Sequence, residues 1–171
     1  MGTGTLVSVE EYLSTSYRPD CDYIDGVILQ RNVGEYDHAR LQAVLTGFFI
    51  TREKQWAVRV LTEICVQIAR TRFRIPDVCI ILASAPVEQI IRTPPFICVE
   101  ILPKDDTVES LQGRIDDYLA FGVRYVWVIN PRSRRVFVYT GEGMYEPKDG
   151  VLHTENPEIV VPLAEVFASL E

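Results

Sequence analysis

Two runs of sequence decide the fold of this chain, Arg74-Ile-Pro-Asp77-Val-Cys-Ile-Ile-Leu82 and Pro95-Phe-Ile-Cys-Val-Glu100-Ile-Leu102. Both runs are apolar and rich in β-branched residues, which is typical of buried β-strands. Each run also carries one carboxylate, Asp77 at the mouth of the first strand and Glu100 near the end of the second. We therefore expect two central strands that can lie side by side and bring two acidic groups to one place.

The two carboxylates need an explanation, because a charge in an apolar strand is costly to desolvate without a partner charge or a metal ion. Asp77 and Glu100 are 23 positions apart and lie on strands that could be neighbours, which suggests a shared cation. The alternative is a solvated Asp at a strand end and an unrelated ion-paired Glu. The spacing alone leaves both interpretations open.

The sequence after Glu100 predicts a helix followed by a third strand. Asp106-Thr-Val-Glu109 is a capping signal, and the helix that it opens should run to about Phe121 and stop at Gly122. Its expected buried residues are Val108, Leu111, Ile115 and Leu119. Residues 125–129 form a nearly unbroken apolar strand, and residues 136–139 should pair with it. A strand–helix–strand crossover makes part of a sheet parallel, so we expect an α/β fold with a mixed central β-sheet, flanking helices and additional β-hairpins.

Three arginines alternate with other residues just before the first central strand. Residues 58–68 alternate between apolar and polar types, which predicts one long strand or a bent pair of strands. Arg70, Arg72 and Arg74 continue the alternation, so their side chains should point the same way. Such a row could hold phosphates of a nucleic acid, or it could be a solvated edge that prevents sheet-to-sheet pairing. The pattern does not choose between them.

The N-terminal part predicts a short helix, a hairpin and a longer helix. Ser8-Val-Glu-Glu11 is a capping box, and Asp25-Gly26 is the signature of a two-residue hairpin turn. Residues 35–54 follow a helical period, and His38 lies on the apolar face of that helix. A histidine in such a position is either a core residue with a satisfied nitrogen or a functional group. At the other end, Pro162 should open a short helix through Phe167.

Composition limits the possible classes of protein. The 171 residues fit one domain spanning 1–171, with residues 1–5 expected to be disordered. The formal net charge of −7 argues against non-specific coating of nucleic acid, although a local basic groove is still allowed. The cysteines lack C-x-x-C spacing, which predicts reduced thiols in a cytoplasmic protein. No leader or membrane-spanning run is evident, and no nucleophile elbow, P-loop, dinucleotide fingerprint or zincin motif occurs.

Ile-Pro-Asp77 followed by Val-Glu100-Ile-Leu resembles the signature of the PD-(D/E)xK, or restriction-endonuclease-like, nuclease superfamily. More narrowly, the chain resembles a family of short restriction-endonuclease-like proteins long catalogued as a domain of unknown function. The resemblance covers nearly the whole chain. It includes Asp22-Tyr-Ile-Asp25-Gly26, His38, Arg114-Ile-Asp-Asp-Tyr118 and Gly122-Val-Arg-Tyr-Val-Trp127-Val-Ile-Asn-Pro131.

The resemblance implies a metal-dependent endonuclease that hydrolyses phosphodiester bonds of double-stranded DNA, acting as a homodimer. Asp77, Glu100 and the backbone carbonyl of Ile101 would then hold Mg²⁺ or Mn²⁺. Asp22 stands where the family usually has Glu and would be an auxiliary acid. By resemblance His38 and Tyr118 would be auxiliary residues. The candidate nucleic-acid-binding residues, Arg70, Arg72 and Arg74, come instead from the alternation described above.

The chain departs from the superfamily motif at its lysine. The motif places Lys two positions after Glu100, where this chain has Leu102. In the similar family a helical lysine four positions before a tyrosine takes this role, and here that position is Arg114. Arginine can clamp phosphate but cannot lose its proton near neutral pH. Lys104 is the rival, provided that the strand continues past Pro103. The alternative function is therefore a catalytically weakened relative that binds nucleic acid or a protein partner.

Overall fold

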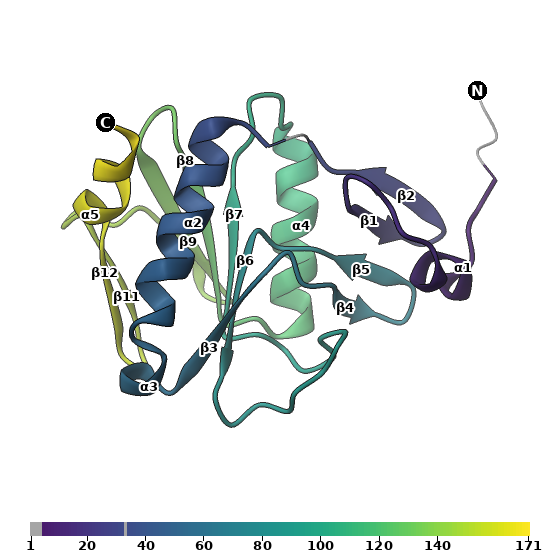
Figure 1. The fold of residues 1–171 in the computed structure, drawn as a ribbon, viewed down its shortest axis with the longest axis horizontal. Coiled ribbons are helices and arrows are strands. Elements are labelled where there is room, and N and C mark those ends of the chain that lie inside the picture. The colour runs from purple at the N-terminus through teal and green to yellow at the C-terminus, as the bar shows by residue number, and fades with distance from the viewer. Residues whose placement is uncertain (1–4, 33) are drawn as a thin grey trace.

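The computed structural model of the chain describes residues 5–32 and 34–171. Its centre is a six-stranded sheet in the order β10-β9-β8-β7-β6-β3, and a four-stranded sheet in the order β2-β1-β5-β4 lies beside it (Figure 1). The central strands are β3 (Val58–Thr62), β6 (Val78–Leu82), β7 (Ile97–Ile101), β8 (Tyr125–Asn130), β9 (Arg135–Thr140) and β10 (Gly143–Tyr145). The strands of the smaller sheet are β1 (Cys21–Ile24), β2 (Val27–Gln30), β4 (Val66–Ala69) and β5 (Arg72–Arg74).

The two runs that carry the acids form neighbouring antiparallel strands, as expected. β6 pairs with β7 in a register that sets Val78 opposite Val99. Asp77 directly precedes Val78, and Glu100 directly follows Val99, so the antiparallel register brings both acids to one end of the β6–β7 pair. β7 then continues through α4 (Val108–Phe121) into β8, which runs parallel to it. The mixed α/β fold predicted from the sequence is therefore confirmed.

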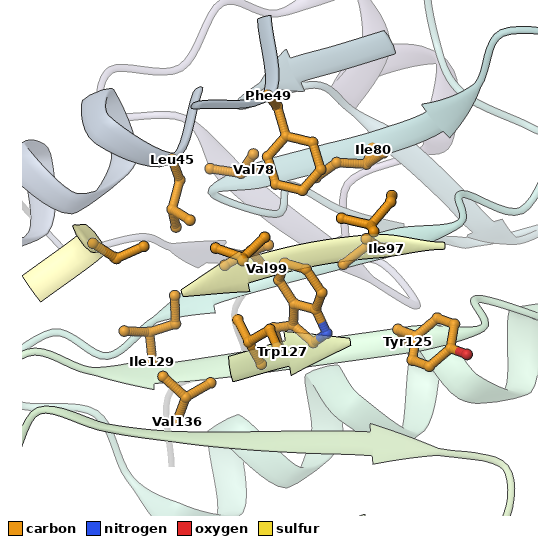
Figure 2. Close-up of a cluster of buried hydrophobic side chains, with 14 of the residues drawn as sticks. Leu45, Phe49, Val78, Ile80, Ile97, Val99, Tyr125, Trp127, Ile129 and Val136 are labelled. Carbon is orange, nitrogen blue, oxygen red and sulfur yellow. The ribbon is translucent and has the colours of Figure 1, made fainter. Parts of the chain in front are cut away.

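One face of the central sheet is covered by α2 (Tyr36–Ile50), α3 (Glu53–Trp56), α5 (Leu163–Phe167) and the hairpin of β11 (Val151–Thr154) with β12 (Ile159–Pro162). The core on this face is made by fully buried side chains of the strands and of α2 (Figure 2). Trp127 of β8 is 0% exposed, and its ring centroid lies 6.2 Å from that of Phe49. This packing fixes α2 across the sheet and so fixes the position of its first turn near Asp77.

The other face of the sheet is covered by α4 and by strands of the smaller sheet. Ile115 and Tyr118 of α4 pack in one apolar cluster with Cys98 of β7 and Val66 of β4. A third, aromatic cluster lies under α1 (Val9–Ser14), where Tyr12 stacks on Tyr23 at 5.0 Å between centroids. The smaller sheet therefore meets α4, and the residues of β1 and β5 that face this helix come close to the end of β7.

Local signals predicted several boundaries correctly. Ser8 caps α1 by accepting a hydrogen bond from the backbone of Glu11. Asp25 and Gly26 both have positive φ, 49° and 94°, as a two-residue hairpin turn requires. Gly122 ends α4 with a φ of 108°, and α5 follows Pro162. The cysteines of the chain are free thiols.

Other expectations were wrong. Of the two alternatives for residues 58–68, the single long strand is wrong, since the segment forms two strands, β3 and β4, which belong to different sheets. Arg70 lies in the turn before β5, so the row of three arginines is broken. Val108 is 84% exposed rather than buried, since it occupies the first, outward-facing turn of α4. Thr107 rather than Asp106 caps that helix.

No helix among the described residues is long and apolar enough to cross a membrane. Of residues 1–5, expected to be disordered, residues 1–4 lie outside the described part of the chain, and Thr5 is exposed and outside regular structure.

Candidate active site

A cavity of about 810 Å³ opens at the end of the β6–β7 pair where Asp77 and Glu100 lie. Its lining comes from the segments around β1 and β2, the first turns of α2 and α4, and the ends of β5 and β7. Among the predicted site residues, the lining includes Asp22, His38, Arg74, Asp77, Glu100, Ile101 and Arg114. The fold thus gathers into one cavity residues that span most of the sequence.

Asp77 is 2% exposed, and both of its carboxylate oxygens accept hydrogen bonds. Its Oδ1 accepts from Arg31 Nη2 at 2.5 Å and from His38 Nε2 at 3.2 Å, and its Oδ2 accepts from the backbone N–H of Ile101 at 2.7 Å. Gln42 of α2 donates to the main-chain carbonyl of Asp77 at 2.9 Å. Three segments, the residues after β2, helix α2 and strand β7, therefore hold this one residue in place.

These contacts also set the charge state of the Asp77 carboxyl group. Burial raises its pKa, but the hydrogen bond from His38 and the positive charge of Arg31 outweigh burial, so the pKa lies below its usual value. For His38, burial lowers the pKa and the bond to Asp77 raises it, with a net upward shift. His38 is thus a partner of the predicted acid rather than an isolated core histidine.

Glu100, which is 4% exposed, has a different set of partners from α4. Tyr118 donates its hydroxyl to Oε1 at 2.6 Å, and Arg114 Nε donates to Oε2 at 3.0 Å. The same guanidinium also bonds Asp106 and, at 2.9 Å, the Ser110 hydroxyl. Arg114 therefore lies between two carboxylates at the edge of the cavity, in direct contact with Glu100.

The pKa of Glu100 is raised to about 7. Burial is the main cause, the charge of Arg114 opposes it, and the neighbouring charge of Asp77 adds to the rise. The charge of one carboxylate is expected to raise the pKa of a close neighbouring carboxyl group, which agrees with the direction of this shift, although burial contributes more. That the two groups share one ion stays a prediction.

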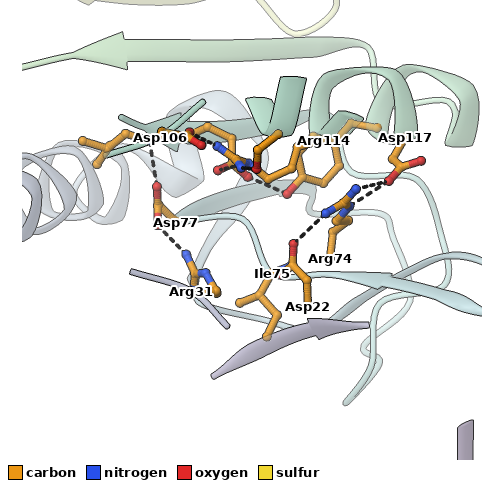
Figure 3. Close-up of polar contacts among 12 residues, drawn as sticks. Asp22, Arg31, Arg74, Ile75, Asp77, Asp106, Arg114 and Asp117 are labelled. Carbon is orange, nitrogen blue, oxygen red and sulfur yellow. Dashed lines mark hydrogen bonds and ion pairs between the residues drawn. The ribbon is translucent and has the colours of Figure 1, made fainter. Parts of the chain in front are cut away.

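Arg74 has a role that the sequence did not indicate. It is 6% exposed and bridges two buried acids: Nη1 donates to Asp22 at 3.0 Å, while Nε and Nη2 each lie 2.7 Å from Asp117 Oδ2 (Figure 3). Arg72 binds the other oxygen of Asp117 at 2.6 Å, and the backbone of Ile75 donates to Asp22 at 3.2 Å. This network ties the smaller sheet to α4 and leaves Arg74 engaged by carboxylates.

Two other predicted residues lie away from these networks. β7 ends at Ile101, so the condition under which Lys104 would extend beside Glu100 is not met. Lys104 is exposed in the turn before α4 and is not part of the cavity lining. Arg70 is exposed in the β4–β5 turn. Asp117, three residues after Arg114, pairs instead with Arg72 and Arg74, because it lies on the side of α4 that faces β5.

Sequence reasoning missed Arg31 and Asp106. Arg31 follows β2 without any periodic signal, and Asp106 was interpreted only as part of a helix cap. Their importance comes from their partners: Arg31 pairs with Asp77, 46 residues away, and Asp106 pairs with Arg114, 8 residues away. Figure 3 shows Arg31 approaching Asp77, and Asp106 lying beside Arg114.

The residues present fit a hard divalent cation with few protein ligands. A carboxylate oxygen can accept about two hydrogen bonds or metal bonds. Asp77 Oδ2 and both oxygens of Glu100 accept one hydrogen bond each. Within residues 5–32 and 34–171, no group of three or more His, Cys, Asp or Glu side chains is arranged around a metal position. A site with only the two carboxylates of Asp77 and Glu100 suits Mg²⁺, which is held by one or two carboxylates and otherwise by water and phosphate oxygens.

A family model described as "Putative restriction endonuclease", Uma2, matches residues 9–170. The chain belongs to this family. A solved structure with the same fold is described as a "putative nuclease belonging to DUF820" from Anabaena variabilis ATCC 29413. It is 20% identical, the match covers 96% of this chain and 99% of that chain, and the TM-score is 0.84. No match to a curated protein was found.

Membership of the Uma2 family confirms the resemblance deduced from the sequence, and it supports a nuclease function at the coarse level. Metal-dependent members of restriction-endonuclease-like families hold their ion with oxygen ligands, which is the chemistry that Asp77 and Glu100 offer. In this member of the family, arginines from two different segments contact these carboxylates. Each of the two acids is therefore in direct contact with a guanidinium group.

Proposed function

We propose that the chain is a Mg²⁺- or Mn²⁺-dependent endonuclease that hydrolyses phosphodiester bonds of double-stranded DNA. The observation that carries this proposal is the placement of Asp77 and Glu100 at one end of neighbouring strands, in the lining of a single cavity. Family membership supports the choice of a nuclease over other uses of such an acid pair.

Asp77, Glu100 and the backbone carbonyl of Ile101 would hold the ion. When bound, a divalent cation polarises a phosphoryl oxygen and makes water a better nucleophile at neutral pH. A ligand to this cation must be ionised, and the contacts of His38 and Arg31 lower the pKa of Asp77 and so keep its carboxylate ionised. Glu100 must be ionised to act as a ligand, and its charge is stabilised by Arg114 and Tyr118.

Arg114 is the residue that we assign to the substrate phosphate. Its guanidinium already touches Glu100, so a phosphate beside the ion would come within its reach. Burial lowers the pKa of Arg114, but the neighbouring charges of Glu100 and Asp106 outweigh burial and raise it, so the guanidinium stays charged. It therefore acts by stabilising negative charge in the transition state and not by proton transfer. Asp22 belongs to the Arg74 network, which makes it an auxiliary acid that shapes the cavity.

DNA contacts would come from the arginines in and just before β5, the strand that carries Arg74 of the cavity lining. Arg70 is exposed and Arg72 is half-buried, whereas Arg74 is enclosed by Asp22 and Asp117. Cutting both strands of a duplex calls for two sites, which is the reason for proposing a homodimer.

The test is cleavage of supercoiled, linear and single-stranded DNA in Mg²⁺ and in Mn²⁺, with the wild type and Asp77→Asn. Loss of a ligand should reduce the rate by at least about a hundredfold, because the ion stabilises the transition state by several kcal/mol. Asp116→Asn is the matched control, since Asp116 is exposed on α4 next to the buried Asp117. Metal-independent cleavage, or equal rates in the two variants, would refute the proposal.

A second candidate is a weakened relative that binds nucleic acid or a protein without cutting. It is favoured by Leu102 and Arg114 at the two positions where lysine would be expected, and by the arginines that already neutralise the carboxylates. Calorimetric titration with Mn²⁺ separates the candidates. Binding that disappears in Asp77→Asn supports the endonuclease, whereas absence of binding in the wild type supports the weakened relative.

A further inference from the structure

Arg31 occupies the place beside Asp77 where a cation would be expected. Its Nη2 lies 2.5 Å from Asp77 Oδ1, which is the shortest of the contacts made to this carboxylate. The arginine side chain is 20% exposed and the Asp77 side chain 3%, so the pair is poorly screened by water. Arg31 and the cation would be alternative partners of the same negative charge.

The hydrogen bonds on Asp77 show where the competition arises. Oδ1 already accepts from both Arg31 and His38, which fills its two acceptor positions. Oδ2 has one position left beside the Ile101 N–H. A metal ion on Oδ1 must therefore displace a donor, and a metal ion on Oδ2 would lie close to the positive charge of Arg31.

Of the two donors on Oδ1, Arg31 is the one free to leave. His38 is built into the first turn of α2, whose face packs in the main core. Arg31 instead follows β2, an edge strand whose residues Val27, Leu29 and Gln30 are exposed. A second acid, Glu63, lies 3.9 Å from Arg31 Nη1 and is 49% exposed, so a displaced guanidinium has another partner within reach.

We infer that Arg31 is an internal counter-ion of Asp77 that competes with the divalent cation, and that metal binding releases its guanidinium toward Glu63. Arg31 is in this sense a positioning residue: it keeps Asp77 ionised and oriented while no cation is bound. The cost is weaker metal affinity, because each binding event must break the Arg31–Asp77 pair. This inference rests on the proposed function only in assuming that Asp77 is a ligand.

The test compares Mn²⁺ and Mg²⁺ affinity, measured by calorimetry, in the wild type, Arg31→Ala and Arg18→Ala. Arg18 lines the same cavity and is exposed, so its removal changes the cavity charge equally without touching Asp77. We expect Arg31→Ala to bind the ion at least about tenfold more tightly. Arg18→Ala should change the dissociation constant by no more than about threefold, because solvent screens its charge.

Two further measurements locate the effect. The double variant Arg31→Ala with Asp77→Asn should lose the gain, since the competitor and its acid are then both absent. In the wild type, the NMR signal of the Arg31 Nε–H group, assigned with Arg31→Lys, should shift on titration with Mg²⁺ and saturate with the calorimetric dissociation constant. This second measurement does not depend on the stability of any variant used for binding.

The outcomes separate the two proposals. Unchanged or weaker binding in Arg31→Ala, beside clear binding in the wild type, overturns the inference and leaves the endonuclease proposal intact. Equal tightening in Arg31→Ala and Arg18→Ala also overturns it, because the effect is then general electrostatics. Absence of binding in every variant overturns both proposals, since removal of the competitor should expose any cation site at Asp77.

Discussion

Replacement of Arg74 by methionine is the sharpest test of how this site is held together. Arg74 makes three charged contacts of 2.7 to 3.0 Å with Asp22 and Asp117, and methionine keeps the apolar part of the side chain while removing all three. Removing one partner of a buried pair typically costs about 3–5 kcal/mol, because a buried charge is left uncompensated.

The contacts that remain after the substitution narrow the expected loss of stability within that range. Asp117 keeps Arg72 at 2.6 Å, whereas Asp22 keeps only the backbone N–H of Ile75. Burial already raises the pKa of Asp22 against the opposing charge of Arg74, so without Arg74 the pKa of this carboxyl should rise further, and uptake of a proton should limit the loss of stability. We therefore expect Arg74→Met to lower the free energy of unfolding by about 3 kcal/mol at pH 7, near the lower end of the range.

The assay is equilibrium unfolding in urea followed by circular dichroism. With a slope of about 1–3 kcal/mol per molar urea, the midpoint should fall by roughly 1–3 M, a large part of the stability of a typical domain. Arg70→Met is the matched control: Arg70 is exposed in the turn just before β5, and its replacement should change stability by less than about 0.5 kcal/mol. Adding Asp22→Asn to Arg74→Met should recover part of the loss. A loss below about 1 kcal/mol, or equal losses in the two methionine variants, would refute the reasoning.

Three further predictions concern the chemistry of the site. The pKa of Glu100 is about 7 in the folded chain against an ordinary value of 4.5, so Glu100 loses its proton at a lower pH in the unfolded chain than in the folded chain. The free energy of unfolding should therefore fall by up to about 3 kcal/mol as pH rises between these values. In urea midpoints from pH 4 to 8, Glu100→Gln should become more stable relative to the wild type as pH rises, while a constant difference would argue against the shift. If cleavage is measurable, Arg114→Lys should keep or raise the rate and Arg114→Ala should lower it at least about tenfold, and a silent Arg114→Ala would move the phosphate role elsewhere. Replacing Arg70 and Arg72 together by alanine should weaken DNA binding at low salt and flatten its salt dependence by roughly two phosphate contacts, whereas an unchanged slope would make them a solvated edge.

Local features of the chain could be predicted because each depends on residues close in sequence. The hairpin turn at Asp25-Gly26 needs two residues that tolerate positive φ, and both have it. The β7–α4–β8 crossover follows from an apolar strand, a capped helix of 14 residues and a second apolar strand. Asp77 and Glu100 could be singled out because a charge in an apolar strand needs a partner, although their spacing left a shared cation and separate partners both open.

Only the tertiary structure decided what those partners are. Arg31, His38 and Ile101 reach Asp77 from a loop, a helix and a strand, and no sequence period links these segments. An ion pair depends on the positions of both charged groups to within an ångström or two, whereas periodicity reports only the face of one element.

The arginines show the same limit. The alternation at residues 70, 72 and 74 was visible in the sequence. The sequence did not show that a turn breaks the row at residue 70, or that the smaller sheet carries Arg74 beneath α4. Arg74 and Asp117 are 43 residues apart and meet because the smaller sheet packs against that helix. The sequence by itself therefore determined the secondary-structure elements and the positions of the two acids within them. The packing of distant elements decided which basic side chains neutralise these acids, because a buried charge is stable only beside a partner that the fold places within contact distance.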